Sequence, residues 1–315
     1  MCADFLKTYR KGGLLMANQN IEEHSEMEIQ SKEKKKVSGW RDFYRRLKKN
    51  KAALIGFYTI VFLTIVAIVG PFMTSMDPDK VDVVNRFSPP SADNWFGTDH
   101  MGRDIFTRII HGMKYTLGIG FASVILGALM GVPLGIFAGY YGGKIDTVIM
   151  RLIDILLAFP GILLALAIVS ILGGSLVNVT IAVAIYAIPG FARIVRGSTL
   201  AAKKLEYVDA IRALGASDNR IIFKHILPNV SSPVIVNATL YIASAILTAA
   251  GLSFLGMGAQ PPTPEWGAML NDGRGYIFDS SYIAFFPGVA IVIVVLAFNI
   301  FGDGLRDALD PKSRN

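Results

Sequence analysis

Long apolar stretches alternate with polar segments along the 315 residues of the chain. A run of roughly 18 or more apolar residues is typical of a helix that crosses a membrane. Six stretches reach or approach this length, at about 52–73, 115–141, 147–172, 177–191, 232–254 and 284–301. The pattern predicts an all-α membrane protein with six transmembrane helices.

The polar segments divide the chain around these helices. Residues 1–37 are polar and have few aromatic side chains, which predicts a disordered tail. Residues 38–51 carry an aromatic stripe opposite a basic face, which predicts a helix that lies in the membrane interface. The remaining parts are a predicted loop at 74–112, a core of five helices at 113–305 with polar segments at 198–228 and 255–282, and a tail at 306–315.

The charges indicate an orientation in the membrane. The chain has 31 Lys and Arg against 24 Asp and Glu, which gives a net charge of +7. Most of the basic residues lie before the first span, after the second, after the fourth and after the sixth. Because cytoplasmic loops of membrane proteins collect Lys and Arg, both termini are expected in the cytoplasm. The lipid bilayer explains the positive charge, and no nucleic-acid partner is expected.

The N-terminal residues add few constraints. The single cysteine, Cys2, excludes an internal disulfide framework and a cysteine-based metal site. Residues 1–10 lack the apolar region of a secretory signal, so the first span is expected to direct insertion itself. Met1 and Met16 both stay open as the start of translation.

The polar segment at 207–229 predicts a helical hairpin between the fourth and fifth spans. A helix is expected at 198–214, because apolar residues recur there at helical spacing. The stripe consists of Tyr207, Ala210, Ile211 and Leu214. Gly215 follows, where a helix C-terminus favours glycine, and Pro228 is expected to end the second helix. Since this segment is expected in the cytoplasm, it is a candidate docking surface for a partner protein.

The third span contains two charged residues. Arg151 and Asp154 lie one turn apart and are predicted to form a structural ion pair, although an ionisable residue inside a membrane is also a functional candidate. Pro160-Gly161 is predicted to bend this helix. In the second span, glycines spaced by four residues predict close helix packing, at Gly127, Gly131, Gly135 and Gly139.

The loop at 74–112 raises the question of a metal site. His100 and His111 share this loop with Asp99 and Asp104. Their spacing fits no standard zinc pattern. The alternative is that Asp99, Arg103 and Asp104 bond to one another and to the backbone and so order the loop. We therefore predict no metal site and no catalytic group in this chain.

The hairpin resembles the cytoplasmic EAA motif of permease subunits of bacterial ABC importers. That motif is usually written as EAA, three residues, G, nine residues and I-x-L-P. The matching positions here are Asp209, Ala210, Ile211, Gly215, Leu227 and Pro228. Asp209 replaces the glutamate, Ile211 replaces the second alanine, and His225 replaces the isoleucine. The segment GASDNRIIFKHILPN is nevertheless similar to the version found in the peptide and nickel importer branch.

Three further stretches narrow the resemblance to the C-type permease subunit of dipeptide, oligopeptide and nickel importers. They are FGTDHMGRDIFTR, RLIDILLAFPGILLA and PPTPEWGAML. The first contains the loop residues for which a structural role is expected, Gly97, Thr98, Asp99, Gly102, Arg103 and Asp104. The resemblance covers roughly residues 40–310.

The resemblance implies a type I ABC importer permease fold in the bacterial inner membrane. It implies as partners a second, B-type permease subunit, two cytoplasmic ATPase subunits and an external substrate-binding protein. The hairpin would be the coupling helix that docks its stripe in a groove of an ATPase subunit. The chain has no GxxxxGK[ST] phosphate loop. ATP and Mg²⁺ are therefore expected in the ATPase subunits, with no cofactor and no enzymatic activity in this chain.

Three alternatives stay open at this point. Peptides are the expected substrates, and nickel or a metal chelate is the first alternative. An ion-coupled secondary transporter usually shows inverted repeats and several intramembrane ionisable sites, which a single Arg–Asp pair matches poorly. An intramembrane enzyme would need a polar catalytic pair inside the spans, and the sequence contains no such pair. The sequence therefore favours the ABC import permease.

Overall fold

The computed structural model describes residue 45 and residues 47–309, and we consider the compact unit that begins at Leu47. The tail predicted at 1–37 lies outside the described residues. So do most of the interfacial helix predicted at 38–51 and the last residues of the tail predicted at 306–315.

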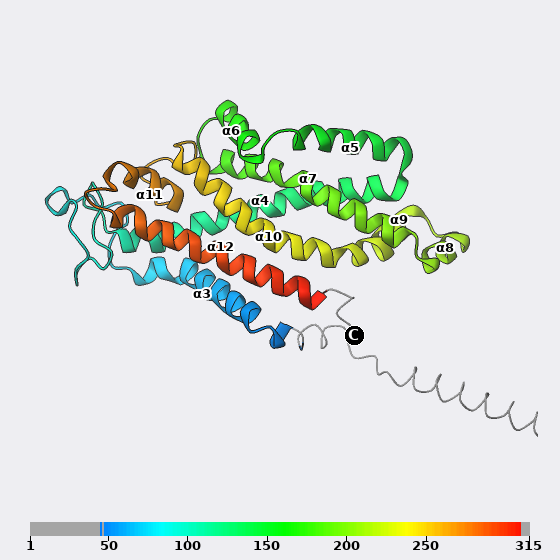
Figure 1. The fold of residues 1–315 in the computed structure, drawn as a ribbon, viewed down its shortest axis with the longest axis horizontal. Coiled ribbons are helices and arrows are strands. Elements are labelled where there is room, and N and C mark those ends of the chain that lie inside the picture. Colours follow the sequence, from blue (N-terminus) through cyan, green and yellow to red (C-terminus); the bar gives the residue numbers. More distant parts are fainter. Residues whose placement is uncertain (1–44, 46, 310–315) are drawn as a thin grey trace, which may run out of the picture. The chain divides into compact units, whose positions relative to one another are not determined.

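Helices make up most of this unit (Figure 1). The five long ones are α3 (Lys51–Met73), α4 (Ile105–Tyr141), α7 (Leu176–Lys203), α10 (Leu227–Phe254) and α12 (Tyr282–Leu309). The shorter ones are α5 (Gly143–Leu157), α6 (Gly161–Leu172), α8 (Glu206–Ala213), α9 (Asp218–Ile221) and α11 (Trp266–Gly273). Single turns are formed by η1 (Val83–Asn85), the π-helical η2 (Ile222–Ile226) and η3 (Arg274–Tyr276).

The helical membrane architecture predicted from the sequence is confirmed. In the described part of the chain, five helices are long and apolar enough to cross a membrane, and α5 with α6 forms a sixth candidate that bends by 87°. The bend lies at the predicted Pro160-Gly161, because proline cannot donate a backbone hydrogen bond within a helix. A Cβ at Gly161 would come within 2.1 Å of the Tyr186 ring, so the glycine lets α6 pack closely on α7.

The fourth span is longer than predicted, because α7 continues past residue 191 to Lys203. Pro189 and Gly190 are residues that often kink a helix, but both lie inside α7. A Cβ at Gly190 would stand 1.6 Å from the Tyr241 hydroxyl oxygen. The glycine therefore serves a close contact with α10.

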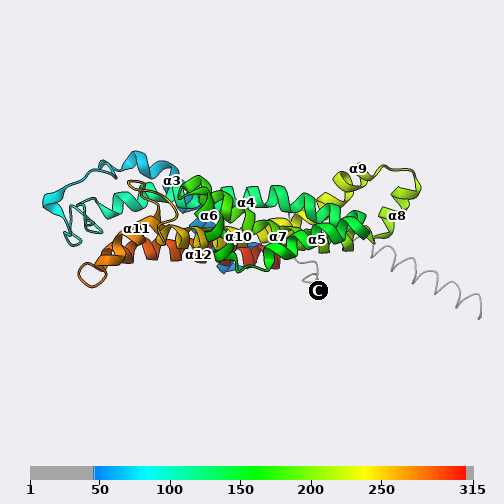
Figure 2. The ribbon, with the colours of Figure 1, turned by 90° about the horizontal axis from the view of Figure 1, so that it is seen from above.

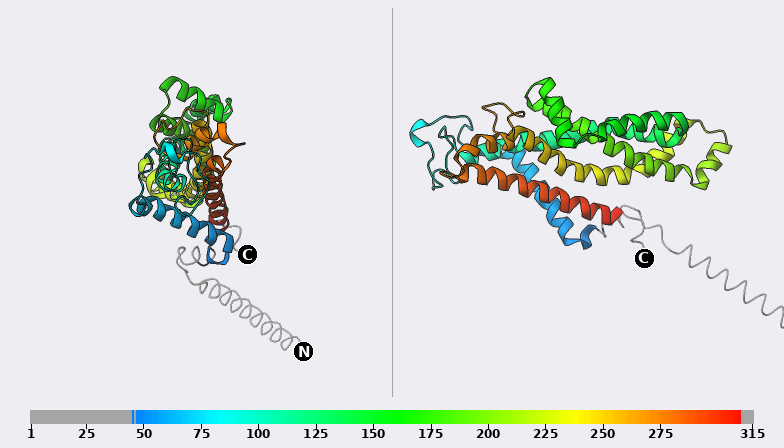
Figure 3. Two further views of the ribbon diagram at one scale, coloured as in Figure 1. Left: turned by 90° about the vertical axis from the view of Figure 1, so that its left-hand side faces the viewer. Right: turned by 45° about the horizontal axis from the view of Figure 1, so that its top comes forward.

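The predicted glycine stripe of α4 packs against α7. A Cβ at any of the four stripe glycines would lie within 3.0 Å of α7 atoms, for example 2.5 Å from the Ala192 carbonyl oxygen at Gly135. Small residues let transmembrane helices approach this closely. On the other side of the bundle, α3 crosses α12 (Figure 3), where the rings of Phe57 and Phe301 stand 5.5 Å apart.

The two ends of the bundle carry different irregular segments. The segment between α3 and α4 lies with α11 at one end, and α8 and α9 lie at the other (Figure 2). A small apolar core ties α8, α9 and η2 to the ends of α4, α7 and α10. A large core lies between α4, α7, α10, α11 and α12. The two polar segments singled out in the sequence are thus each fixed to a rigid helical frame.

Candidate functional site

The predicted hairpin is present, but its helices begin and end at other residues. The expected helix at 198–214 is two helices, because α7 ends at Lys203 and α8 begins at Glu206. Gly215 has φ +82°, as predicted for a residue that follows a helix C-terminus. Pro228 does not end a helix. It lies in the first turn of α10, where proline is tolerated because its missing amide would have no partner there.

One face of α8 anchors the hairpin. Val208 is fully buried, and Ile211 packs partly against the same core as Ile221 and Ile226. The other members of the predicted stripe face outward, and Leu214 is 87% exposed. The stripe that the sequence suggested therefore divides in two. Ile211 holds α8 on the bundle, whereas Tyr207, Ala210 and Leu214 form an open surface.

Tyr140, at the end of α4, joins the two halves of the hairpin. Its hydroxyl donates a 2.6 Å hydrogen bond to Asp218 Oδ1 at the start of α9. The Arg212 guanidinium of α8 stands 5.9 Å from the ring centre, and the ammonium of Lys203 stands 5.5 Å from it. Cations over an aromatic face are attracted by the ring quadrupole. The side chain of Tyr140 also holds the pKa of Arg212 above its ordinary value.

A second contact closes the hairpin on α10. Asn229 Nδ2 donates to the Tyr207 hydroxyl oxygen at 2.6 Å and to the His225 carbonyl oxygen at 2.7 Å. The His225 ring lies 6.1 Å from the Tyr207 ring. His225, which departs from the usual motif, thus packs against the aromatic residue of α8.

The outer surface of the hairpin combines apolar and charged groups. Leu214 and Tyr207 are exposed beside Asp209, whose carboxylate accepts a 3.3 Å hydrogen bond from Arg212. Phe223 of η2 is also exposed, and sequence analysis did not single it out. A solvent-facing aromatic residue in a π-turn follows no helical period, so periodicity could not reveal it. Tyr140 was missed because its partners come from other helices.

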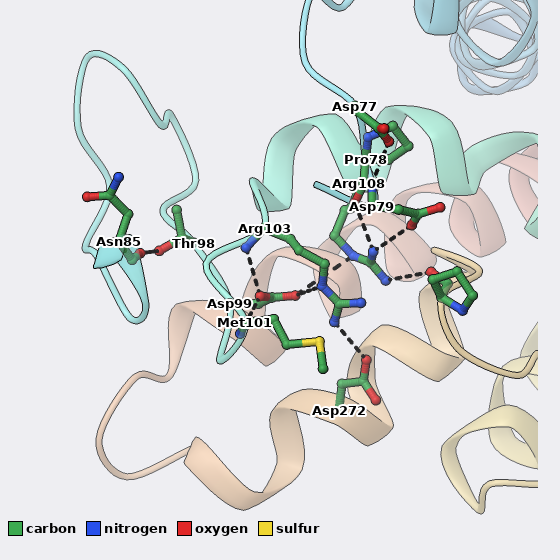
Figure 4. A network of polar contacts seen from close by, with 11 residues as sticks. Asp77, Pro78, Asp79, Asn85, Thr98, Asp99, Met101, Arg103, Arg108 and Asp272 are labelled. Carbon is green, nitrogen blue, oxygen red and sulfur yellow. Dashed lines mark hydrogen bonds and ion pairs between the residues drawn. The ribbon is translucent and has the colours of Figure 1, made fainter. Parts of the chain in front are cut away.

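At the opposite end, two arginines and several carboxylates form a network (Figure 4). Arg103 Nε and Asp99 Oδ2 lie 2.6 Å apart, and both side chains are almost fully buried. Arg103 also reaches Asp272 of α11 at 3.3 Å. Arg108 donates to the Pro78 carbonyl oxygen at 3.0 Å and pairs with Asp79 at 3.2 Å. The network ties the loop to α4 and α11.

The structural role predicted for the loop residues agrees with these contacts in part. Asp99 bonds to Arg103 as expected, and Gly97 and Gly102 have φ +77° and +76°. Asp104 does not join that pair. It caps α4 by accepting a 2.7 Å hydrogen bond from the Thr107 amide. Thr98 donates a hydrogen bond to the Asn85 carbonyl oxygen, which joins two parts of the loop.

Glu265 fixes the start of α11 at the same end. Its carboxylate is fully buried and accepts hydrogen bonds from the amides of Gly267 at 3.0 Å and Ala268 at 2.9 Å. Burial raises the pKa of Glu265, and these hydrogen bonds oppose the rise. The next residue, Trp266, is fully buried and donates its indole N–H to the Ile109 carbonyl oxygen at 3.0 Å. Glu265 and Trp266 thus anchor the start of α11 to α4.

The two histidines of the predicted loop have separate partners, and His111 lies in α4, which begins at Ile105 within the stretch predicted as loop. His111 Nε2 lies 2.8 Å from Thr74 Oγ1, and His100 stacks on Tyr276 with ring centres 5.6 Å apart. In the described part of the chain, no three His, Cys, Asp or Glu side chains come together as a candidate metal-binding group.

The ion pair predicted within the third span is wrong. Asp154 pairs with Arg193 of α7 at 2.7 Å rather than with Arg151. A second bridge, Asp146 with Arg196, also joins α5 to α7, at 2.5 Å. The sequence spacing suggested a contact along one helix, but both carboxylates form ion pairs that join α5 to α7.

The chain matches two families of known proteins. The family described as the binding-protein-dependent transport system inner membrane component matches residues 131–315. The family described as the N-terminal TM domain of oligopeptide transport permease C matches residues 38–90.

Curated relatives resemble the chain over most of its length. It is 50% identical to the dipeptide transport system permease protein DppC of Alkalihalophilus pseudofirmus over 279 residues, which cover 89% of this chain and 92% of the relative. It is 47% identical to the glutathione transport system permease protein GsiD of Pectobacterium atrosepticum over 277 residues, which cover 88% of this chain and 92% of the relative.

The fold resembles that of a solved importer. A chain of the inward-facing MetNI methionine ABC transporter superposes with a TM-score of 0.54 at 21% identity, and the match covers 65% of this chain and 98% of that chain. A second crystal form gives a TM-score of 0.53 at 24% identity, with 64% and 97% covered. Family, relatives and fold agree with the permease resemblance noted in the sequence. The chain belongs to the family of binding-protein-dependent transport system inner membrane components, the permease subunits of ABC importers.

Proposed function

We propose that this chain and a second, B-type permease subunit form the translocation path of an ATP-driven peptide importer. An external binding protein delivers the peptide, and two ATPase subunits bind ATP and Mg²⁺ on the cytoplasmic side. The hairpin, which α8, α9 and η2 form in the structure, is the coupling element. The observation that carries this role is that one face of α8 is anchored while Leu214, Tyr207 and Asp209 stay open to a partner.

The anchoring contacts suit a coupling element. A displacement passes between domains only if the element that receives it is rigidly joined to the helices that must move. Here α8 is joined to α4 through the Tyr140 cluster and to α10 through the Tyr207–Asn229 hydrogen bond. Closure of the ATPases around ATP would therefore move the ends of α4, α7 and α10 together.

Peptides are the proposed substrates. Two relatives that are 50% and 47% identical to this chain carry the names of dipeptide and glutathione permeases. Glutathione is itself a small peptide, so both names describe the same chemical class. The membrane path needs room and polar contacts for such a ligand, whereas selection among peptides falls to the binding protein.

Reconstitution of the complete complex in proteoliposomes tests this proposal. The expected result is uptake of a labelled dipeptide that requires ATP and the binding protein and is blocked by vanadate. Uptake driven by an ion gradient without ATP would identify a secondary transporter instead. ATP hydrolysis stimulated by a nickel-loaded binding protein, with no response to peptides, would establish the metal importer.

A further inference from the structure

The exposed face of α5 and α7 carries three charges within the spanning helices. Asp154 and Arg193 form their 2.7 Å pair with side chains that are 53% and 55% exposed. Arg151 lies one turn before Asp154, is also exposed, and has no ion pair or hydrogen bond within the described part of the chain. The cluster therefore holds one paired and one unpaired guanidinium on an open surface.

These charges lie well inside the candidate spans. At 1.5 Å per residue, Arg193 is about 15 Å from the nearer end of α7, and Asp154 is about 17 Å from the start of α5. A membrane core is about 30 Å thick. Charged side chains within a spanning helix face a water-filled cavity or another protein, because contact with lipid tails is costly.

The cluster adds little to the attachment of α5. The neighbouring Asp146–Arg196 bridge already joins α5 to α7 through two hydrogen bonds of 2.5 and 2.6 Å, and its side chains are less exposed, at 19% and 34%. Ile153 is buried between the same helices. The exposed pair and the free Arg151 are therefore available to a ligand.

The break after α5 adds a second polar feature. α5 ends at Leu157, one turn beyond Asp154, and the chain bends by 87° before α6. The C-terminal end of a helix carries a partial negative charge. Broken membrane helices present such ends and unwound carbonyl groups to polar substrates. Along α5, a cationic group at Arg151 is thus followed by an anionic group at Asp154 and then by the negative end of the helix.

We infer that Arg151, Asp154 and Arg193 line the translocation path and bind the charged ends of a peptide. Arg151 takes the terminal carboxylate, since a guanidinium binds carboxylate through two parallel hydrogen bonds. Asp154 and the end of α5 take the terminal ammonium group. The order of charges along α5 matches a zwitterionic main chain. This inference rests on the proposed function, because it requires that peptides pass this face.

Competition between peptides with altered ends tests the inference in the assembled transporter. Uptake of a dipeptide is compared with uptake of its C-terminal amide, in the wild type and in Arg151→Gln and Arg151→Lys. The loss of one charged hydrogen bond corresponds to about a tenfold change. We expect Arg151→Gln to reduce the preference for the free carboxylate about tenfold, and Arg151→Lys to retain most of it. The binding protein is the same in every case, so its own preference cancels.

Thiol labelling provides the second measurement. In a Cys2→Ser background, Arg151→Cys is expected to react with a charged, membrane-impermeant thiol reagent in the complete complex and to be protected by the dipeptide. Ile125→Cys, exposed on the apolar surface of α4, is the matched control and should stay unreactive.

Three results would overturn the inference. The first is an unchanged carboxylate preference in Arg151→Gln. The second is an Arg151→Cys variant whose thiol reacts in the isolated chain but is shielded in the complex without peptide, which would assign the cluster to the contact with the second permease. The third is loss of complex assembly in Arg151→Gln, which would give that same assignment. In each case, ATP-dependent dipeptide uptake by the wild type would leave the proposed function intact.

Discussion

The hydroxyl of Tyr140 donates a hydrogen bond of 2.6 Å to Asp218, and this bond joins the end of α4 to the start of α9. The residues lie on either side of α7 and α8 in the sequence, so the bond fixes the hairpin to a helix that does not adjoin it. Its loss should loosen the hairpin without changing the surface that we propose to face an ATPase subunit.

Tyr140→Phe tests this connection. The substitution keeps the ring beneath Arg212 and Lys203 but removes a hydrogen bond to a carboxylate, which typically contributes about 1.5–3 kcal/mol. We expect ATP-dependent uptake to fall several-fold while the ATPase subunits still co-purify. Tyr141→Phe, at the adjacent exposed position, is the control. Equal uptake in both variants would refute a coupling role for the bond.

Substitutions at Gly215 distinguish the effect of backbone strain from that of steric hindrance. Its φ is +82°, and a Cβ there would meet no atom within 4 Å. Valine should therefore destabilise the turn through the backbone alone, by about 1–3 kcal/mol. Asparagine tolerates this conformation far better. We expect uncoupled ATP hydrolysis in Gly215→Val and near-normal transport in Gly215→Asn. Equal transport by the two variants would show that the left-handed turn is unimportant.

The buried Asp99–Arg103 pair should dominate the stability of the end of the bundle that carries α11. Removal of one partner from a buried ion pair costs about 3–5 kcal/mol, because the remaining charge is left uncompensated. Asp99→Asn should therefore clearly lower the thermal stability of the purified chain in detergent. The remaining ion pair of Arg103 with Asp272 should offset part of this loss. Asp93→Asn, on the exposed part of the same loop, should change it little. A small effect at both positions would contradict the network's structural role.

Glu265 should make stability depend on pH. Burial raises its folded-state pKa above the unfolded value. The protonated form is thus favoured by folding, and stability is lost as pH rises through the raised pKa. Glu265→Gln removes this titration, so the wild type should lose thermal stability relative to the variant as pH rises from the unfolded-state pKa through the raised folded-state pKa. A constant difference between them across this range would show that the carboxyl does not titrate as its burial implies.

Local patterns in the sequence correctly predicted several parts of this structure. The Gly215 turn, the Asp99–Arg103 pair and the glycine face of α4 each depend on residues close in the chain or on one helical period. Errors arose where a contact joins distant segments. Asp154 pairs with Arg193 instead of Arg151, because α7 lies beside α5 and offers a guanidinium at 2.7 Å.

The stripe on α8 shows the same limit. Helical spacing grouped Ile211 with Leu214, but only the packing of η2 and α10 decides which residue is covered. The sequence also revealed only part of the loop network, namely the pair between Asp99 and Arg103. Asp272 follows Arg103 by 169 positions, so no local spacing could reveal the bond between them.

Chemical modification of Leu214→Cys tests the central claim that the open face of α8 docks on an ATPase subunit. Leu214 is 87% exposed and outside the anchoring core, so its change should leave the fold intact. In a Cys2→Ser background, the permease is treated with a bulky maleimide and then mixed with tagged ATPase. The account predicts loss of ATPase co-purification and of ATP-dependent uptake for Leu214→Cys, and no loss for Phe278→Cys at the opposite end. Full co-purification and uptake with modified Leu214→Cys would contradict it.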